Sequence, residues 1–123
     1  MSLLIDDDRP IFAQIAERIE NDIIDDVLPE ESQVPSTNQF AAYYKINPAT
    51  AAKGVNLLVD QGILYKKRGI GMFVATGARS RLLEARKEQF YEQYVIRMLS
   101  EANKLGITEE QLTQMIKRGA MLK

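Results

Sequence analysis

The chain has 123 residues with 16 basic and 17 acidic side chains, a net charge of −1, and neither cysteine nor histidine. Without cysteine there is no disulfide or thiolate chemistry, and without histidine the usual general base and the commonest metal ligand are missing. No apolar run approaches the roughly 20 residues of a membrane span, and the N-terminus is acidic where a secretory signal would be basic. We therefore expect a cytoplasmic protein without cofactor, metal or membrane contact, built as one domain with an appendage or as two very small domains.

Charge is distributed unevenly along the chain. Residues 1–31 carry ten acids and two bases, residues 32–76 carry five bases and one acid, and residues 77–123 carry nine bases and six acids. The middle segment is therefore the basic one, as a nucleic-acid-binding surface requires. The acids near the N-terminus fit an ordinary solvated helix face.

The N-terminal part predicts an amphipathic helix that starts at Pro10, because proline suits the first helical turn. Its apolar residues recur every four positions, which indicates one core-facing side: Ile11, Ile15, Ile19, Ile23 and Val27. Leu28 precedes Pro29, which disfavours helical geometry, so the segment through Gln33 is expected to be an extended connector.

Two short helices around a tight turn follow. Ser36 with Gln39 matches a capping box, and Asn47 followed by Pro48 is a strong start signal for the second of these helices. Gly62 suits a left-handed helix end. Residues 63–67 and 72–75 are β-prone runs around a basic, glycine-containing tip, and we expect them to be anchored on the helices by Ile63, Leu64, Tyr65 and Phe73. This order predicts a winged helix-turn-helix.

The last part of the chain predicts one long helix that Gly106 ends and a final helix that starts with a capping box, Thr108 with Gln111. A lone helical hairpin cannot bury so wide an apolar band, so it either folds over the winged domain or pairs with a second copy. We favour pairing, with the dimer contact formed by Leu83, Phe90, Tyr94, Met98, Leu105, Leu112, Met115 and Ile116. Phe90, Tyr91 and Tyr94 could also line a pocket for a small-molecule effector, but a helical core explains them equally well.

The fold expected is mainly α with a small β-hairpin. Residues 1–9 are an N-terminal segment, residues 10–77 a winged helix-turn-helix DNA-binding domain, and residues 78–123 a two-helix dimerisation tail.

The ordered set of motifs resembles the GntR family of bacterial transcription regulators. The resemblance covers roughly residues 10–76 and is carried by Pro10-Ile11-Phe12-Ala13-Gln14-Ile15, Val34-Pro35-Ser36, Asn47-Pro48-Ala49-Thr50, Leu64 and Arg68-Gly69-Ile70-Gly71-Met72-Phe73-Val74. The short tail and the Asn-Pro helix start look like the YtrA-type branch. The resemblance implies a homodimeric DNA-binding regulator, often a repressor. Asn38 and Met72 depart from the arginine and threonine usual in the family, and Asn38 lacks the bidentate reach of arginine to guanine.

Residues expected to contact DNA lie at the two helix starts and in the wing: Ser36, Thr37, Asn38, Asn47, Pro48, Ala49, Thr50, Lys53, Lys67, Arg68, Gly69, Ile70 and Gly71. Ala49 and Thr50 would meet base edges, and Lys53, which also matches a basic family position, would meet phosphate. Each has a structural alternative. Caps and turn glycines are needed by the fold itself, Thr50 could bond its own helix, and Lys53 could simply be solvated.

An enzyme is the first rival class, and the sequence disfavours it. The run Asp6-Asp7-Asp8 cannot converge well on one ion, and no phosphate-binding glycine loop is present. A winged helix used for protein interaction is the second rival, and it would bind without the steep salt dependence of DNA binding. The sequence therefore predicts a sequence-specific transcriptional regulator, a homodimeric repressor at an inverted-repeat operator, with an effector left open.

Overall fold

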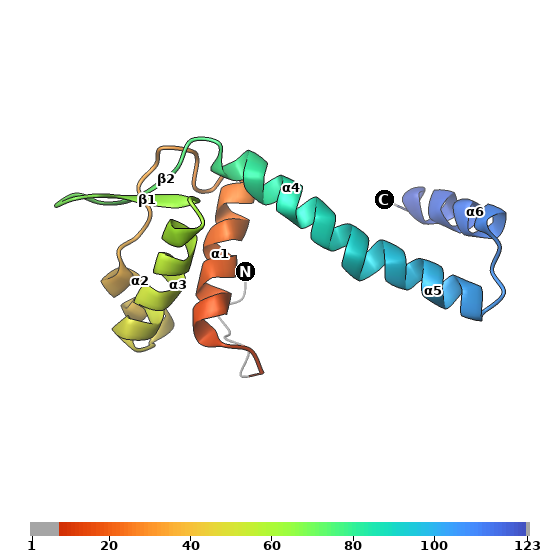
Figure 1. Ribbon diagram of the computed structural model, residues 1–123, viewed down its shortest axis with the longest axis horizontal. Coiled ribbons are helices and arrows are strands. Elements are labelled where there is room, and N and C mark those ends of the chain that lie inside the picture. The colour runs from red at the N-terminus through yellow and green to blue at the C-terminus, as the bar shows by residue number, and fades with distance from the viewer. Residues whose placement is uncertain (1–7, 123) are drawn as a thin grey trace. The chain divides into compact units, whose positions relative to one another are not determined.

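The computed structural model describes residues 8–122, so most of the predicted N-terminal segment, residues 1–9, lies outside the described residues. The chain forms two compact units that divide between Leu83 and Glu84. The first contains α1 (Ile11–Ile24), α2 (Thr37–Tyr44), α3 (Pro48–Asp60), β1 (Leu64–Lys67), β2 (Gly71–Val74) and the start of α4 (Ala78–Phe90). The second contains the rest of α4, η1 (Tyr91–Val95), α5 (Ile96–Lys104) and α6 (Glu109–Ala120) (Figure 1). A mainly helical chain with one β-hairpin is confirmed.

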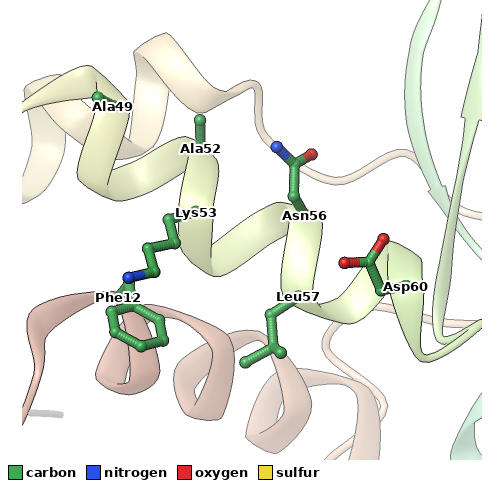
Figure 2. Close-up of a pocket in the computed structure, with 7 residues that line it drawn as sticks. All are labelled: Phe12, Ala49, Ala52, Lys53, Asn56, Leu57 and Asp60. Atoms are coloured by element: carbon green, nitrogen blue, oxygen red, sulfur yellow. The ribbon is translucent and has the colours of Figure 1, made fainter.

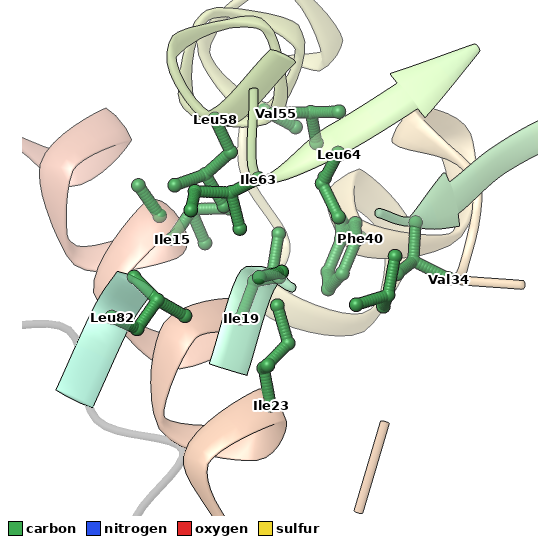
Figure 3. Close-up of a cluster of buried hydrophobic side chains, with 14 of the residues drawn as sticks. Ile15, Ile19, Ile23, Val34, Phe40, Val55, Leu58, Ile63, Leu64 and Leu82 are labelled. Atoms are coloured by element: carbon green, nitrogen blue, oxygen red, sulfur yellow. The ribbon is translucent and has the colours of Figure 1, made fainter. Parts of the chain in front are cut away.

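Helix α1 supplies the central stripe of the first core, because Ile15, Ile19 and Ile23 are each only 1% exposed. They pack with side chains of the connector, α2, α3, β1 and α4, and Figure 3 shows this cluster converging between the elements. The helix ends at Ile24, because the amides of residues 27 and 28 both return to the carbonyl of Asp22. Val27 therefore lies beyond the helix and is 63% exposed, and its assignment to the core-facing stripe is wrong.

Helices α1 and α3 cross closely, and Gly54 makes the crossing possible. A Cβ atom at this position would lie 2.6 Å from the backbone carbonyl oxygen of Phe12 and 3.1 Å from the Cβ of Ile15. Neither distance is compatible with an unshifted helix pair. Helix α3 is thus seated directly on α1.

Strands β1 and β2 are antiparallel, with Leu64 paired to Val74 and Tyr65 paired to Phe73. Since side chains alternate across a strand, Leu64 and Val74 share the buried face. Tyr65 and Phe73 stack on the opposite, half-exposed face, with their ring centroids 5.9 Å apart. The expectation that these two aromatic residues anchor the hairpin on the helices is wrong, and the buried Ile63 and Leu64 carry that role.

The connector before α2 lies along the free edge of β2. The Val34 amide donates to the Met72 carbonyl at 2.9 Å, and the Val74 amide donates to the Ser32 carbonyl at 3.0 Å. The connector predicted to be extended through Gln33 is extended only at its end, because residues 29–32 form a turn in which Glu31 has φ 67° and the Ser32 amide donates to the Pro29 carbonyl at 3.1 Å. The backbone bonds of Ser32 and Val34 hold β2 on the edge opposite β1. The β1–β2 hairpin is the wing, and in Figure 1 its tip extends past the helices of the first unit.

The start of α4 packs on the first unit, where Ala78 and Leu82 are buried in the core. Arg79 donates from Nε to the Ile24 carbonyl at 2.9 Å, and Arg81 donates from Nη2 to the Gly62 carbonyl at 2.6 Å. These cations satisfy the last carbonyls of α1 and of the turn after α3, where a helix favours positive charge.

The second unit continues α4 through the π-helical turn η1 into α5, and Gly106 at φ 72° ends this helix as predicted. The predicted capping box of Thr108 and Gln111 is present, with bonds of 2.9 and 3.1 Å. Ala102 is the one buried apolar side chain among the described residues of this unit. Within residues 8–122, no helix is both long and apolar enough to cross a bilayer.

Candidate nucleic-acid interface

Helix α2 begins at a complete capping box. The Gln39 amide donates to Ser36 Oγ at 3.1 Å, and the Ser36 amide donates to Gln39 Oε1 at 2.7 Å. Thr37 is half-exposed, and Ser36 and Asn38 are exposed. The cap satisfies two of the free amides of the first turn, and the remaining ones can meet an anion from solvent.

The turn between α2 and α3 is tight because Lys45 adopts a left-handed conformation at φ 56°. The Ile46 amide then donates back to the Ala41 carbonyl at 3.0 Å. Asn47 caps α3, since its Oδ1 accepts from the Ala49 amide at 2.7 Å, and Pro48 occupies the first turn. This confirms the predicted helix start and leaves the leading end of α3 at the surface.

The outward strip of α3 is the face opposite the core residues Ala51, Val55 and Leu58. Together with Phe12 of α1, residues of α3 line a surface hollow of about 520 Å³: Ala49, Ala52, Lys53, Asn56, Leu57 and Asp60, of which Leu57 also packs against the core. Figure 2 shows Ala52 and Asn56 pointing away from α1. Ala52 and Asn56 lie on this strip and were not among the residues predicted to contact DNA, and the helical spacing of three and four residues places both near Ala49 and Lys53.

Lys53 does not extend freely into solvent. Its Nζ lies 4.1 Å from the centroid of the Phe12 ring, a cation–π contact that reaches from α3 back to α1 (Figure 2). The ring face attracts the ammonium group and limits the positions of a long, flexible side chain. Phe12 was not among the residues predicted to bear on DNA binding, so its contact with a candidate DNA-binding residue was missed.

The wing carries its charge at the tip. Lys67 and Arg68 are exposed, and the turn closes when the Ile70 amide donates to the Lys67 carbonyl at 2.9 Å. Gly69 has φ 77°, a conformation that side chains with a Cβ rarely adopt. Lys67 Nζ lies 4.4 Å from the Phe73 ring centroid, so the cation lies over the aromatic face of the hairpin.

A polar cluster ties the connector to the base of the wing. The Glu31 carboxylate accepts from Thr76 Oγ1 at 2.6 Å and from the Tyr65 hydroxyl. The bonds from Thr76 and Tyr65 favour the charged carboxylate and lower the pKa of Glu31. The same carboxylate raises the pKa of Tyr65, because it accepts a hydrogen bond that only the protonated hydroxyl can donate.

None of the residues predicted to contact DNA is buried. Thr37, Thr50 and Gly71 are half-exposed, and the others are exposed: Ser36, Asn38, Asn47, Pro48, Ala49, Lys53, Lys67, Arg68, Gly69 and Ile70. The helix starts and the wing belong to the same compact unit.

The residues predicted for dimerisation all belong to α4, α5, α6 or the turns next to them. Leu83 and Leu112 are half-exposed, and the rest are exposed: Phe90, Tyr94, Met98, Leu105, Met115 and Ile116.

An exposed, capped helix beside a basic hairpin defines the winged helix-turn-helix class of DNA-binding proteins. The model of the bacterial regulatory proteins, gntR family, matches residues 12–74, about half of the chain. The chain belongs to this family. It is a DNA-binding transcriptional regulator and not an enzyme.

Two relatives from Bacillus subtilis (strain 168) resemble nearly the whole chain. The HTH-type transcriptional regulator YhcF is 27% identical over 89% of this chain and 88% of its own length. The HTH-type transcriptional repressor YtrA is 26% identical over 88% of this chain and 82% of its own. The YtrA-like resemblance of the sequence is confirmed.

Solved structures agree with this placement. A chain from Bacteroides thetaiotaomicron described as a GntR-family transcriptional regulator superposes with a TM-score of 0.77 and 34% identity, covering 90% of this chain and 96% of that one. The DNA-binding domain of AraR in complex with operator ORX1 superposes with a TM-score of 0.54 and 29% identity, covering 61% of this chain and 90% of that one.

Proposed function

We propose that this regulator is a homodimeric repressor that binds an inverted-repeat operator. Residues 10–77 bind DNA in this proposal, and residues 78–123 form the dimer. The observation that carries it is the exposed leading end of α3 together with a wing tip that has two unburied cations, both within the same compact unit. YtrA is named a repressor and the AraR domain binds its operator, which supports the same activity here. A DNA partner places the protein in the cytoplasm.

The first turn of α3 reads base edges in the major groove. Ala49 and Thr50 offer a methyl group and a hydroxyl, which suit a thymine methyl and a base acceptor or phosphate. Lys53 lies one turn further along, where its ammonium group can neutralise a phosphate. Asn38 at the start of α2 hydrogen-bonds a base edge or phosphate without the charge of an arginine.

The wing grips the backbone beside the groove. Lys67 and Arg68 provide the charge, and the small residues Gly69 and Gly71 allow the tip to approach a sugar-phosphate surface closely. Contacts of this kind hold the protein in register and add affinity that falls with salt.

The second unit supports the dimer. Large apolar side chains of its described residues are strongly exposed, including Phe90 at 58%, Tyr94 at 62% and Leu105 at 65%. Such an exposed apolar band is a liability in a monomer and typical of a protein interface. A two-fold pair of winged domains would match two half-sites about 34 Å apart, one turn of DNA.

The test is a genomic DNA pull-down with the purified full-length protein, followed by footprinting of the recovered site. We expect two symmetric protected half-sites and an affinity that falls steeply as salt rises. Thr50→Ala with Lys53→Ala should weaken binding about tenfold or more without changing the circular dichroism spectrum, since a good base contact and a phosphate contact are lost. Lys104→Ala, a charge control in α5, should bind like the wild type. Unchanged affinity in the double variant would remove α3 as the reading helix.

A further inference from the structure

Gln33 connects the segment before α2 to the tip of the wing. It forms an isolated antiparallel bridge with Phe73, so it lies beside β2. Its side-chain Nε2 donates to the carbonyl of Ile70 at 3.1 Å, across 37 positions of the chain. Ile70 belongs to the exposed turn that joins the two strands of the wing.

Gly71 makes room for this contact. A Cβ atom at position 71 would lie 2.5 Å from Gln33 Nε2, and Gly71 has φ 147°, which a side chain disfavours. Glycine at this position therefore leaves the space that the Gln33 amide occupies, in addition to permitting the positive φ of the hairpin. The sequence around Gln33 and the sequence around Gly71 give no sign that the two residues lie together.

Two hydrogen bonds fix the backbone of Ile70 at the wing tip, one through its amide and one through its carbonyl. Its amide donates to the Lys67 carbonyl inside the hairpin, and its carbonyl accepts from Gln33 outside it. The connector is itself fixed to β2 by the backbone bonds of Val34 and Ser32. A short exposed turn without such a brace pays an ordering cost when it binds a partner.

We propose that Gln33 is a positioning residue for DNA binding, which holds the wing tip in its contacting conformation before DNA arrives. The inference rests on the proposed function of the wing. Gln33 acts through the backbone of Ile70, and the cations of Lys67 and Arg68 on the preceding side of the turn make the contacts. Pre-ordering the turn spares part of the cost of immobilising them.

The variant for the test replaces the side-chain amide of Gln33 with an apolar group of similar size. Gln33→Met removes the donor, and Gln61→Met, at an exposed position after α3, is the matched control. Affinity is measured for the duplex recovered in the pull-down and for a mixed-sequence 30-base-pair duplex. We expect Gln33→Met to bind the recovered duplex about three- to tenfold more weakly than the control, the range that corresponds to ordering one or two groups. Melting temperatures of the two variants should agree.

Amide exchange provides a readout that a general loss of stability would not mimic. In free protein, Gln33→Met should speed exchange at the Ile70 amide and leave the core amides of α1 and α3 unchanged. Gly71→Ala should have a similar effect, because its Cβ displaces Gln33. The double variant should be no weaker than the weaker single variant, since both remove the same contact.

Two outcomes would overturn the inference. One is equal affinity of Gln33→Met and Gln61→Met, and the other is unchanged exchange at Ile70. Failure of the proposed function looks different, because the wild type itself would then bind both duplexes weakly or without salt dependence. If the wild type binds and Gln33→Met binds equally well, only the role of Gln33 is lost.

Discussion

Lys53 illustrates how a residue on one helix can depend on a residue of another. Its contact with the Phe12 ring limits the motion of the ammonium group, so less entropy is lost when the group meets a phosphate. Phe12→Leu should keep the apolar packing and release the lysine. We expect DNA affinity to fall about two- to fivefold, corresponding to the roughly 0.5–1 kcal/mol of an exposed cation–π contact.

The control for this prediction is the same substitution in a Lys53→Ala background. If Phe12 acts through Lys53, adding Phe12→Leu to that background changes the affinity no further. An equal loss in both backgrounds would show that Phe12 contributes by packing alone. Fluorescence anisotropy with a labelled duplex measures all four proteins.

Gly54 gives a prediction about stability. Gly54→Ala gains up to about 1 kcal/mol of helix propensity but forces a Cβ against the α1 backbone, which typically costs about 1–3 kcal/mol. Because the closest atom belongs to the backbone, the cost should lie in the upper part of that range, so we expect net destabilisation of about 1–2 kcal/mol, seen as a lower melting temperature. Gly119→Ala is the control, because a Cβ there meets nothing within 4 Å. It should leave stability unchanged or raise it. A Gly54→Ala variant as stable as the wild type would mean that the helices can separate without loss.

The sequence could predict those residues whose role depends on near neighbours. Ser36 and Asn47 bond to amides two or three positions away, and that spacing is visible in the sequence. Gln33 and Phe12 have partners that only the fold brings near, 37 positions away for Gln33 and in another helix for Phe12. Their roles could not be read from local pattern.

At the scale of elements, the junction between the connector and the wing should respond to pH through Glu31. Bonds from Thr76 and Tyr65 lower the pKa of this carboxyl in the folded protein. A group with a lowered folded pKa stabilises the fold above its unfolded pKa, and this contribution is lost as the pH falls through the folded pKa. We therefore expect the contribution of Glu31 to be complete at pH 7 and to fade below about pH 4.3, the ordinary glutamate value.

Glu31→Gln isolates that contribution, because glutamine keeps the size and loses the charge. The difference in unfolding free energy between wild type and variant, from urea titrations, should be positive at pH 7 and shrink towards pH 3. Glu88→Gln, at an exposed position of α4, controls for the loss of one negative charge. A difference that stays constant with pH, or equals that of Glu88→Gln, would contradict the role of the carboxylate.

The positions of the elements were more predictable than their faces and ends. Helix starts at Pro10, Asn47 and Thr108 have caps or prolines that act locally. The end of α1 depends on amides that turn back to Asp22, so the apolar spacing that includes Val27 was misleading. Which side chains of the hairpin face the core depends on the strand register, which pairs Tyr65 with Phe73 on the side away from the core. The π-helical turn η1 has no signal in the apolar spacing of the tail.

At the scale of the whole molecule, the sequence predicted an apolar band with no partner within its own hairpin, and the exposed side chains of the second unit agree with this. The band marks a surface to be covered, and the partner that covers it is a second molecule, which no spacing within one chain specifies. The proposed dimer therefore needs a variant that weakens association and leaves the fold intact.

Tyr94→Glu is such a variant. Tyr94 is 62% exposed within η1 and its ring lies 5.4 Å from that of Phe90, so both belong to the same aromatic surface. A carboxylate buried at an interface without a partner is costly, so we expect the dissociation constant of the dimer to rise by at least about tenfold. Sedimentation velocity over a range of concentrations measures this constant. Gln93→Glu, an exposed neighbour on the same turn, adds the same charge and should sediment like the wild type.

Weaker association should also lower operator affinity, because a dimer presents its second winged domain at a high effective concentration once the first has bound. Tyr94→Glu should bind a single half-site like the wild type and bind the full inverted repeat with most of its advantage lost. Gln93→Glu should retain that advantage. If Tyr94→Glu sediments as the wild type does, or if wild-type protein is a monomer at micromolar concentration, the second unit does not form the proposed dimer. An apolar surface that tolerates a carboxylate in place of Tyr94 is not buried at that position against a copy of itself.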